Sequence, residues 1–302
     1  MFYPPNLSDA GNGIRTRVTS LGNPVQQEKP AHIHASDIDK YFLLREIEGI
    51  CKDWQQNSRR WIKTYLDYVS WTVDEDKTLL YCKKIKDTSS VTYYRKQIYQ
   101  IRRFLEYLKI DWASAIKLPP EPEYLPKRVS SDAIDTLLDG FKDHKYVKQI
   151  KALILLGCSS GMRAEELYQL APNDIDLSHR IVHINHNPHN GQTTKTQRSR
   201  ISFFNVNAQK ILSEYLEYFN NGNGLEVLFG HSHLFPIFKD SPVKIKDFRK
   251  YFSQEWDRRG GPTSIKKILM GHSMRGDVDL CHYNAQSEED LKAIYDRVMG
   301  DS

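Results

Sequence analysis

The stretch VKQIKALILLGCSSGMRAEELYQL, residues 147–170, predicts two helices joined by a Gly/Ser turn. Arg163 lies at the junction between the turn and the second helix. Its side chain can therefore point out of the domain while Leu167 and Leu170 face the interior. An arginine in this setting is more often the ion-pair partner of a nearby carboxylate, here Glu166. The stretch alone thus predicts a helical core and leaves the role of Arg163 open.

The segments that follow predict a hairpin and further helices. β-Branched runs at residues 180–187 and 198–204 flank the polar segment 188–197, which is typical of a β-hairpin. Lys195 lies near the hairpin tip, in a region from 177 to 213 that contains no carboxylate. A solvated loop lysine is the ordinary interpretation of such a residue. Helical spacing then returns at residues 205–219, 243–258 and 263–270.

The N-terminal part predicts an arm and a helical domain. Residues 1–35 are rich in Pro, Gly, Asn and Ser, whereas residues 36–115 show helical spacing. Within that domain, residues 89–110 combine an apolar stripe with a basic face that we expect to lie on phosphates. A surface helix with a buried stripe explains the apolar half equally well. The basic face consists of Arg95, Lys96, Arg102 and Arg103.

The expected fold is mainly α with a small β-sheet or hairpin in the second domain, an α+β arrangement. Four prolines predict a linker at residues 116–128. The expected order is a flexible arm at 1–35, a helical domain at 36–115, the linker at 116–128, a second domain at 129–286 and a C-terminal helix at 287–302.

Composition limits the class of protein. The 302 residues suffice for two domains, and their net charge of +5 conceals three separate basic clusters, at 83–109, 177–213 and 244–275. One basic face that follows a polyanion such as a nucleic acid would explain them together. A solvated helix surface is the ordinary interpretation of any single cluster. Four isolated cysteines indicate reduced thiols, and the longest aliphatic stretch, at 152–156, is too short to cross a bilayer. The N-terminus lacks a signal-peptide pattern, so we expect a cytoplasmic, nucleoid-associated protein without a membrane partner.

The stretch LMGHSMRGDVDLCHYNAQS, residues 269–287, allows two chemistries. His272, Cys281 and His282 could form a metal site, or one Tyr and one His could act on an incoming group. Zinc needs three or four convergent ligands, and the adjacent residues 281 and 282 point in different directions in most backbones. The spacing therefore disfavours a metal, both here and at the strand histidines His183, His186 and His189.

Together these motifs resemble the tyrosine recombinases, also called the phage-integrase family. The ordered set is Arg163 in GMRAEEL, Lys195 in a hairpin, Lys246 and Arg249 in a KxxR motif, His272 in LMGHS, and Tyr283. Twenty-three residues separate Arg249 from His272, which is the usual spacing in the family. The resemblance covers residues 37–300 and is closest to archaeal viral and plasmid integrases of the fuselloviral kind. These also carry Lys at the position of Lys246, where most members have His.

The resemblance makes residues 36–115 the DNA-binding domain, 129–286 the catalytic domain and 287–302 a docking helix. It also implies DNA strand transfer without metal or cofactor. Tyr283 would attack the phosphodiester to form a 3′-phosphotyrosine, and Lys195 would protonate the leaving 5′-oxygen. Arg163 and Arg249 would clamp the non-bridging oxygens, where charge develops, and His272 would donate a further hydrogen bond.

Lys246 and six further basic residues complete the expected DNA contacts. Lys246 would be a base or a phosphate contact, and its departure from the family's His leaves that role open. Additional DNA contacts are expected from Arg95, Lys96, Arg102, Arg103, Arg198 and Arg200.

The tail predicts a short amphipathic helix. Ser287 and Asp290 form a capping pattern, and an apolar stripe follows at helical spacing. The stripe could dock on its own domain. The family's habit of inserting this element into a neighbouring protomer favours assembly of a tetramer on paired sites, through residues 287–300.

The arm carries a second clue. One permitted coding of Gly-Ile-Arg-Thr in GNGIRTR, residues 11–17, is complementary to the T-arm sequence shared by tRNA genes. Fuselloviral-type integrases carry their attachment site inside their own gene, so we hypothesise integration and excision of a mobile element at a tRNA gene. An ordinary basic arm is the alternative for this segment. For the whole chain the alternatives are a Xer-type dimer resolvase, a type IB topoisomerase-like enzyme, or a DNA-binding protein that has lost catalysis.

Overall fold

The structure is a computed structural model that describes residues 31–220, 226–273 and 286–300. The chain divides into two compact units, residues 1–125 and 126–302, and the division falls inside the expected linker at 116–128. Each unit has its own hydrophobic core. Over the described ranges no helix combines the length and the apolarity that a bilayer crossing requires.

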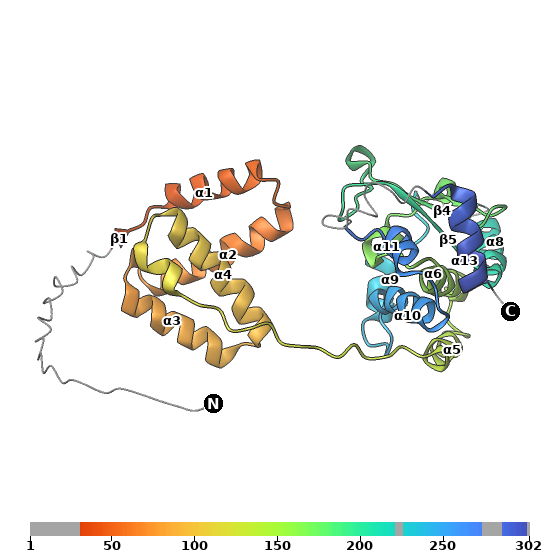
Figure 1. Cartoon of the computed structure of the whole chain (residues 1–302), viewed down its shortest axis with the longest axis horizontal. Helices are drawn as coiled ribbons and strands as arrows, with labels where there is room; N and C mark the ends of the chain where they lie inside the picture. The colour runs from red at the N-terminus through yellow and green to blue at the C-terminus, as the bar shows by residue number, and fades with distance from the viewer. Residues whose placement is uncertain (1–30, 221–225, 274–285, 301–302) are drawn as a thin grey trace, which may run out of the picture. The chain divides into compact units, whose positions relative to one another are not determined.

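The first unit is helical, and its α2 and α4 pack against each other (Figure 1). Its elements are β1 (Ala31–His32), α1 (Ala35–Ile47), α2 (Lys52–Tyr68), β2 (Thr72–Val73), α3 (Glu75–Thr88), α4 (Val91–Tyr107) and the 3-10 helix η1 (Asp111–Ala115). Ser90 caps α4 by accepting from the backbone N–H of Tyr93 at 3.3 Å. The predicted apolar stripe of α4 faces inward, with Ile98, Ile101 and Leu105 fully buried. Helical spacing in the sequence therefore identified the face of α4 that packs in the core.

The second unit surrounds one buried helix. Its elements are α5 (Ser131–Gly140), α6 (Val147–Ser160), α7 (Ala164–Tyr168), η2 (Pro172–Asp174), β3 (Ile175–Asp176), β4 (Ile181–Ile184), η3 (Pro188–Asn190), β5 (Arg200–Phe203), α8 (Val206–Asn220), α9 (His231–Phe238), α10 (Ile245–Arg258), α11 (Thr263–Met270) and α13 (Glu288–Met299). α6 packs against α8 and α10, and Ile150, Leu153 and Leu156 are fully buried there. The mainly α fold with a small sheet is confirmed.

The sheet of the second unit contains the predicted hairpin and one strand more. β4 and β5 pair antiparallel with Ile181 opposite Phe203 and Ile184 opposite Arg200. β3 adds to the other edge of β4, which gives the order β3-β4-β5. β3 has only two residues, and so short a segment carries no alternating pattern from which a strand could be predicted.

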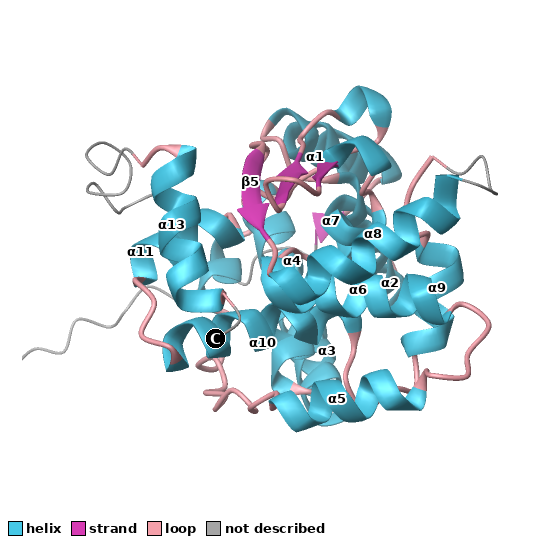
Figure 2. Cartoon of the chain, turned by 90° about the vertical axis from the view of Figure 1, so that its right-hand side faces the viewer, coloured by secondary structure: helices cyan, strands magenta, loops and turns pink. Residues whose placement is uncertain are grey.

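The terminal helix α13 docks on its own unit, beside β5 (Figure 2). Tyr295 is fully buried, its ring centroid lies 5.5 Å from that of Phe203, and its hydroxyl donates to the carbonyl of Ser159 at 2.8 Å. Arg180 binds Asp296 at 2.9 Å on the flank of the helix. In this structure the first of the two alternatives for the tail therefore holds. The preferred alternative, insertion into a neighbouring protomer, stays a prediction, because a single chain does not test it.

Replacing Tyr295 by Ala is expected to lower the free energy of unfolding by about 3–5 kcal/mol, because a buried ring is lost and a cavity remains. Tyr295→Phe keeps the ring and loses the hydrogen bond to Ser159, at a cost of about 1 kcal/mol. Urea titrations measure both changes. The control Arg297→Ala, on the exposed side of α13, should stay within about 0.5 kcal/mol of the parent chain. An effect of Tyr295→Ala that grows on dilution of the protein would contradict docking within one chain.

Candidate active site

The C-terminal end of α11 collects three arginine side chains from three different elements. The carbonyl of Leu269 accepts from Nε of Arg200 at 2.9 Å. The carbonyls of the next two residues, Met270 and Gly271, accept from Arg249 and Arg163, each at 2.7 Å. The last carbonyls of a helix have no partner within the helix and carry a partial negative charge. Three guanidiniums therefore satisfy groups that would otherwise need water.

Arg163 is held at the N-terminus of α7 by Glu166. Its side chain donates to one carboxylate oxygen at 2.7 Å and its backbone N–H donates to the other at 2.8 Å. The Glu166 side chain is only 2% exposed, whereas that of Arg163 is 21% exposed. Both interpretations of Arg163 from the sequence therefore apply, since it pairs with Glu166 and still reaches the surface of the domain.

Glu166 is ionised although it is buried. Burial by itself would raise the pKa of this carboxyl, but its bonds to Arg200 and Arg163 outweigh burial and hold the pKa at about 2. Arg200 contributes a two-pronged contact, with distances of 2.9 and 2.6 Å to the two oxygens. Glu166 thus joins two guanidiniums through one carboxylate.

Arg249 reaches the same place from α10. One of its terminal nitrogens donates to the carbonyl of Gly161 at 2.7 Å as well as to Met270. Burial and the nearby charge of Arg163 lower the pKa of Arg249 to about 10, so it stays protonated at neutral pH. Gly161 ends α6 with a φ of 66°, and a Cβ there would meet the ring of Phe252 at 2.5 Å. The turn after α6 therefore requires glycine to bring its carbonyl to Arg249.

His272 directly follows the three carbonyls. Gly271 closes α11 in the left-handed conformation, with a φ of 63°, and the backbone N–H of His272 donates to the carbonyl of Lys267 at 3.0 Å. Partial burial and the charges of Arg249 and Arg163 lower the pKa of its imidazole. At neutral pH the ring is therefore neutral and retains one N–H donor.

The two lysines of the predicted site lie on the surface. Lys246 is exposed in the first turn of α10, three residues before Arg249 and hence on the same side of the helix. Lys195 is exposed in the loop between β4 and β5. Arg163, Arg249 and the backbone next to His272 are thus brought together by direct contacts, while Lys246 is placed beside them by helix geometry.

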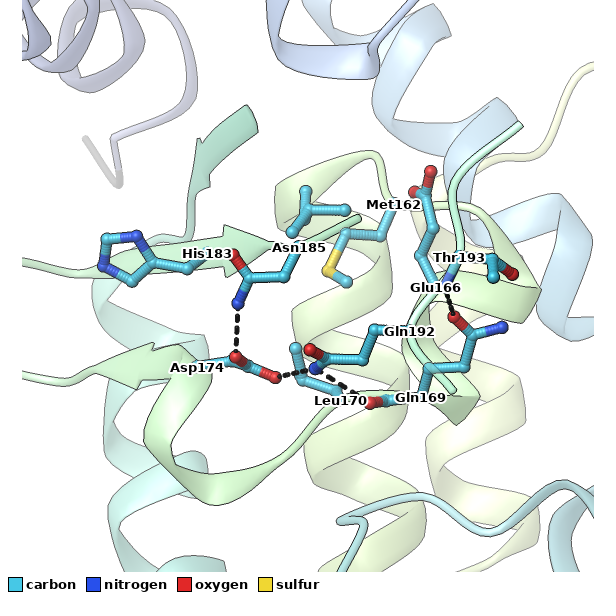
Figure 3. A pocket seen from close by; sticks show the side chains of 10 residues that line it. Met162, Glu166, Gln169, Leu170, Asp174, His183, Asn185, Gln192 and Thr193 are labelled. Atoms are coloured by element: carbon cyan, nitrogen blue, oxygen red, sulfur yellow. Dashed lines mark hydrogen bonds between the residues drawn. The ribbon is translucent and has the colours of Figure 1, made fainter. Parts of the chain in front are cut away.

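The loop that carries Lys195 is anchored at its base by hydrogen bonds. Asp174 is buried and accepts from Asn185 at 2.7 Å and from Gln192 at 2.8 Å (Figure 3). The backbone N–H of Thr193 donates to the side chain of Gln169 at 2.7 Å. These side chains line a small recess beside α7. They are missed from the sequence because single Asp, Asn and Gln residues carry no periodic signal.

The predicted DNA contacts of α4 fall into two groups. Lys96 is exposed, and the guanidinium of Arg103 lies 6.0 Å from the ring centroid of Tyr99. Arg95 instead donates to the carbonyl of Pro119, and Arg102 to that of Ile116 at 3.3 Å. These two side chains hold the first residues of the expected linker along α4.

Arg198 and Arg200 differ although they are two residues apart. Arg198 is exposed, whereas the side chain of Arg200 is 9% exposed and bound to Glu166 and Leu269. We therefore withdraw Arg200 from the expected DNA contacts, because its donors face inward. Alternation along a strand could not separate them, because residues two apart share a face, whereas Arg198 in fact lies in the loop before β5.

Tyr283, Cys281 and His282 lie outside the described residues. Within the described part of the chain, no three His, Cys, Asp or Glu side chains are grouped closely enough to hold a metal. Of the strand histidines, His186 accepts through Nδ1 from the backbone N–H of Thr194 at 3.1 Å, which orients its ring within the loop.

Acid should destabilise the second unit through Glu166. Its pKa is about 2 in the folded chain against an ordinary value of 4.5, so its stabilisation is complete above the ordinary value and is lost as the pH falls toward the folded value. The loss is on the order of 3 kcal/mol, which urea titrations at a series of pH values would measure.

The variant Glu166→Gln should remove this part of the pH dependence and cost about 3–5 kcal/mol at neutral pH, because buried guanidiniums lose their carboxylate. Glu217→Gln, on the exposed face of α8, controls for loss of a carboxylate as such. An unchanged acid dependence in Glu166→Gln would contradict the assignment.

Comparison with known proteins identifies the family of this chain. Residues 127–288 match the sequence pattern of the phage integrase family. Among curated proteins, the tyrosine recombinase XerD of Oceanobacillus iheyensis is 28% identical over 158 residues, which are 46% of this chain and 52% of that protein. XerA of Saccharolobus solfataricus is 26% identical over 165 residues, 54% of this chain and 49% of that protein. XerC of Actinobacillus succinogenes is 33% identical over 90 residues, 28% of this chain and 30% of that protein. The matches thus span about a third to a half of the length of these relatives.

Solved structures show the same fold. The Tn1549 transposon integrase in complex with a circular intermediate DNA superposes with a TM-score of 0.63 at 14% identity, covering 86% of this chain and 99% of that one. The same integrase with transposon right end DNA gives 0.58 at 14% identity, covering 87% and 99%. The family pattern covers more than half of the chain, including Arg163, Arg249 and His272. The chain therefore belongs to the phage integrase family, the tyrosine recombinases.

Proposed function

We propose that this protein is a site-specific tyrosine recombinase that cleaves and rejoins double-stranded DNA through a 3′-phosphotyrosine intermediate. The observation that carries the proposal is the contact of Arg163 and Arg249 with adjacent carbonyls, those of Gly271 and Met270, directly before His272. Two permanent positive charges and one neutral N–H donor thereby meet at one point of the surface of the unit.

This set of groups suits a phosphodiester. Its two non-bridging oxygens gain negative charge when a fifth oxygen bonds to phosphorus, and guanidiniums can donate to both oxygens. Because Arg163 and Arg249 are already held by backbone carbonyls, little reorganisation is needed as the charge develops. His272, with its lowered pKa, supplies a hydrogen bond without adding a further charge.

In the proposed chemistry the phosphotyrosine bond conserves the energy of the phosphodiester bond that is broken. The phenolic oxygen of Tyr283 forms a bond to phosphorus and passes its proton to a base. The bond from phosphorus to the 5′-oxygen then breaks, and Lys195 gives that oxygen a proton. A 5′-hydroxyl of the partner strand reverses the sequence. Lys246 would be a phosphate contact or the base, since it lies on the side of α10 that carries Arg249.

DNA is the proposed partner of both units. Lys96 and Arg103 on α4 and Arg198 beside the Lys195 loop are the side chains proposed to contact phosphates, together with Arg95 and Arg102 at the linker. Such contacts fix the position of the protein on the duplex without reading its sequence. Assembly into a tetramer on two paired sites belongs to the proposal and would require α13 to leave its own unit if that helix makes the contact.

For the biological role we propose a mobile-element integrase of the archaeal viral or plasmid kind, acting at a tRNA gene. The support is the possible antisense T-arm coding of residues 11–17 and the Lys at position 246. The codons of this segment test the idea, because codons that spell no T-arm would remove it. The second candidate is resolution of chromosome or plasmid dimers, favoured by the XerA, XerC and XerD names of the relatives.

Tyr283→Phe is expected to abolish a covalent protein–DNA adduct that the parent chain forms in the presence of a chelator. The variant lacks only the attacking oxygen, so its affinity for DNA should stay within about threefold. Denaturing gels with end-labelled DNA that carries the candidate site measure the adduct. Tyr218→Phe, an exposed tyrosine on α8, is the matched control and should react like the parent chain. An adduct that persists in Tyr283→Phe would exclude this nucleophile.

Lys195→Met should slow adduct formation by roughly 100- to 10,000-fold, the range of a lost general acid. A substrate with sulfur in place of the bridging 5′-oxygen should restore the rate, because a thiolate leaves without a proton. The same substrate should not rescue Arg249→Met, whose loss affects the non-bridging oxygens. Equal rescue of both variants, or of neither, would contradict the assignment of Lys195 as the proton donor.

A further inference from the structure

Arg200 uses its whole guanidinium inside the second unit. Nε donates to the carbonyl of Leu269, and the two terminal nitrogens donate to the two oxygens of Glu166, at 2.6–2.9 Å in all three cases. A side chain that is 9% exposed and has both edges bound in this way is unsuited to a surface contact. The planar fork of arginine, rather than its charge alone, matches the three acceptors.

These acceptors belong to the groups that hold Arg163, which with Arg249 is proposed to bind the phosphate. Glu166 also binds the side chain and the backbone N–H of Arg163. Leu269 lies two residues before Gly271, whose carbonyl accepts from Arg163 at 2.7 Å. Arg200 therefore contacts both of the elements between which Arg163 is held.

The packing of Gly271 shows how close this contact is. A Cβ on Gly271 would come within 2.8 Å of Cδ, Nε and Cζ of Arg200. The guanidinium therefore lies directly against the turn that leads into His272. Glycine is required there twice, by its φ of 63° and by the presence of Arg200.

Arg200 also begins β5, where it pairs with Ile184. The chain between these two residues is the loop that carries Lys195. One buried side chain thus connects the base of the Lys195 loop, the carboxylate partner of Arg163 and the turn before His272.

We infer that Arg200 is a positioning residue of the proposed strand transfer, which aligns Arg163 through Glu166 and the His272 turn through Leu269 without touching DNA itself. The inference rests on the proposed function. It assigns the specific geometry of the clamp to a residue outside the set that contacts the phosphate.

The test compares Arg200→Lys with the parent chain in single-turnover cleavage at saturating DNA. Lysine keeps the charge, but its single nitrogen cannot take the places of the three guanidinium nitrogens that reach Leu269 and Glu166. The cleavage rate should therefore fall roughly 10- to 100-fold, the scale of a misplacement by about 1 Å. The affinity for DNA should stay within about threefold. Arg45→Lys changes another arginine that is nearly buried and paired with a glutamate, in the first unit, and should leave the rate unchanged.

A double-variant cycle identifies the route of the effect. If Arg200 acts on Arg163 through Glu166, the two substitutions should not be additive. The cleavage rate of the double variant Arg200→Lys/Glu166→Gln should then lie within about threefold of the rate of the slower single variant.

Three outcomes would overturn the inference. Weaker DNA binding with an unchanged rate at saturation would make Arg200 a DNA contact. A lower melting temperature with an unchanged rate would make it merely structural, and multiplicative losses in the double variant would exclude the route through Glu166. Failure of the parent chain to form any adduct would instead overturn the proposed function, so the two failures are distinguishable.

Discussion

The end of helix α11 is the feature on which the candidate site depends. Three consecutive carbonyls, those of Leu269, Met270 and Gly271, each accept from a different arginine. A helix C-terminus is a site of partial negative charge, so it attracts guanidiniums that would repel one another elsewhere. Here it draws Arg200 from a sheet strand, Arg249 from α10 and Arg163 from the start of α7.

Glu166 balances only part of this charge. It is the carboxylate shared by Arg163 and Arg200, and among these groups three guanidiniums oppose one carboxylate. The excess of positive charge is what a phosphodiester requires. Partial burial lowers the pKa of His272, and the same excess charge lowers it further. Stability and the proposed function thus act on the same groups in opposite directions. The carboxylate limits the repulsion among the arginines, while the uncompensated charge remains available to DNA.

The hydrophobic core supports this arrangement from behind. β5 begins with Arg200 and ends with Phe203, whose ring packs against Tyr295 of α13. The hydroxyl of Tyr295 bonds the carbonyl of Ser159, near the end of α6, and the turn that follows α6 supplies the carbonyl of Gly161 to Arg249. The terminal helix therefore packs on the same elements that present the arginines. Departure of α13 from its own unit would expose apolar side chains directly beside the candidate site.

The sequence by itself determined the helical periodicity, the hairpin and the order of the reactive side-chain types along the chain. It did so because apolar spacing and short motifs are local properties, and they identified the family and the buried face of α4. Only the tertiary structure decided which basic side chains are bound inside the unit and which are exposed at its surface. Arg198 and Arg200 look alike in the sequence, yet one is exposed and the other is bound on both edges, because the register of β5 and the carbonyls of α11 are set by packing over long separations. The anchoring of the Lys195 loop by Asp174 and the docking of α13 on its own unit have the same origin. Their partners lie from 11 to 136 residues away, outside the reach of a local pattern.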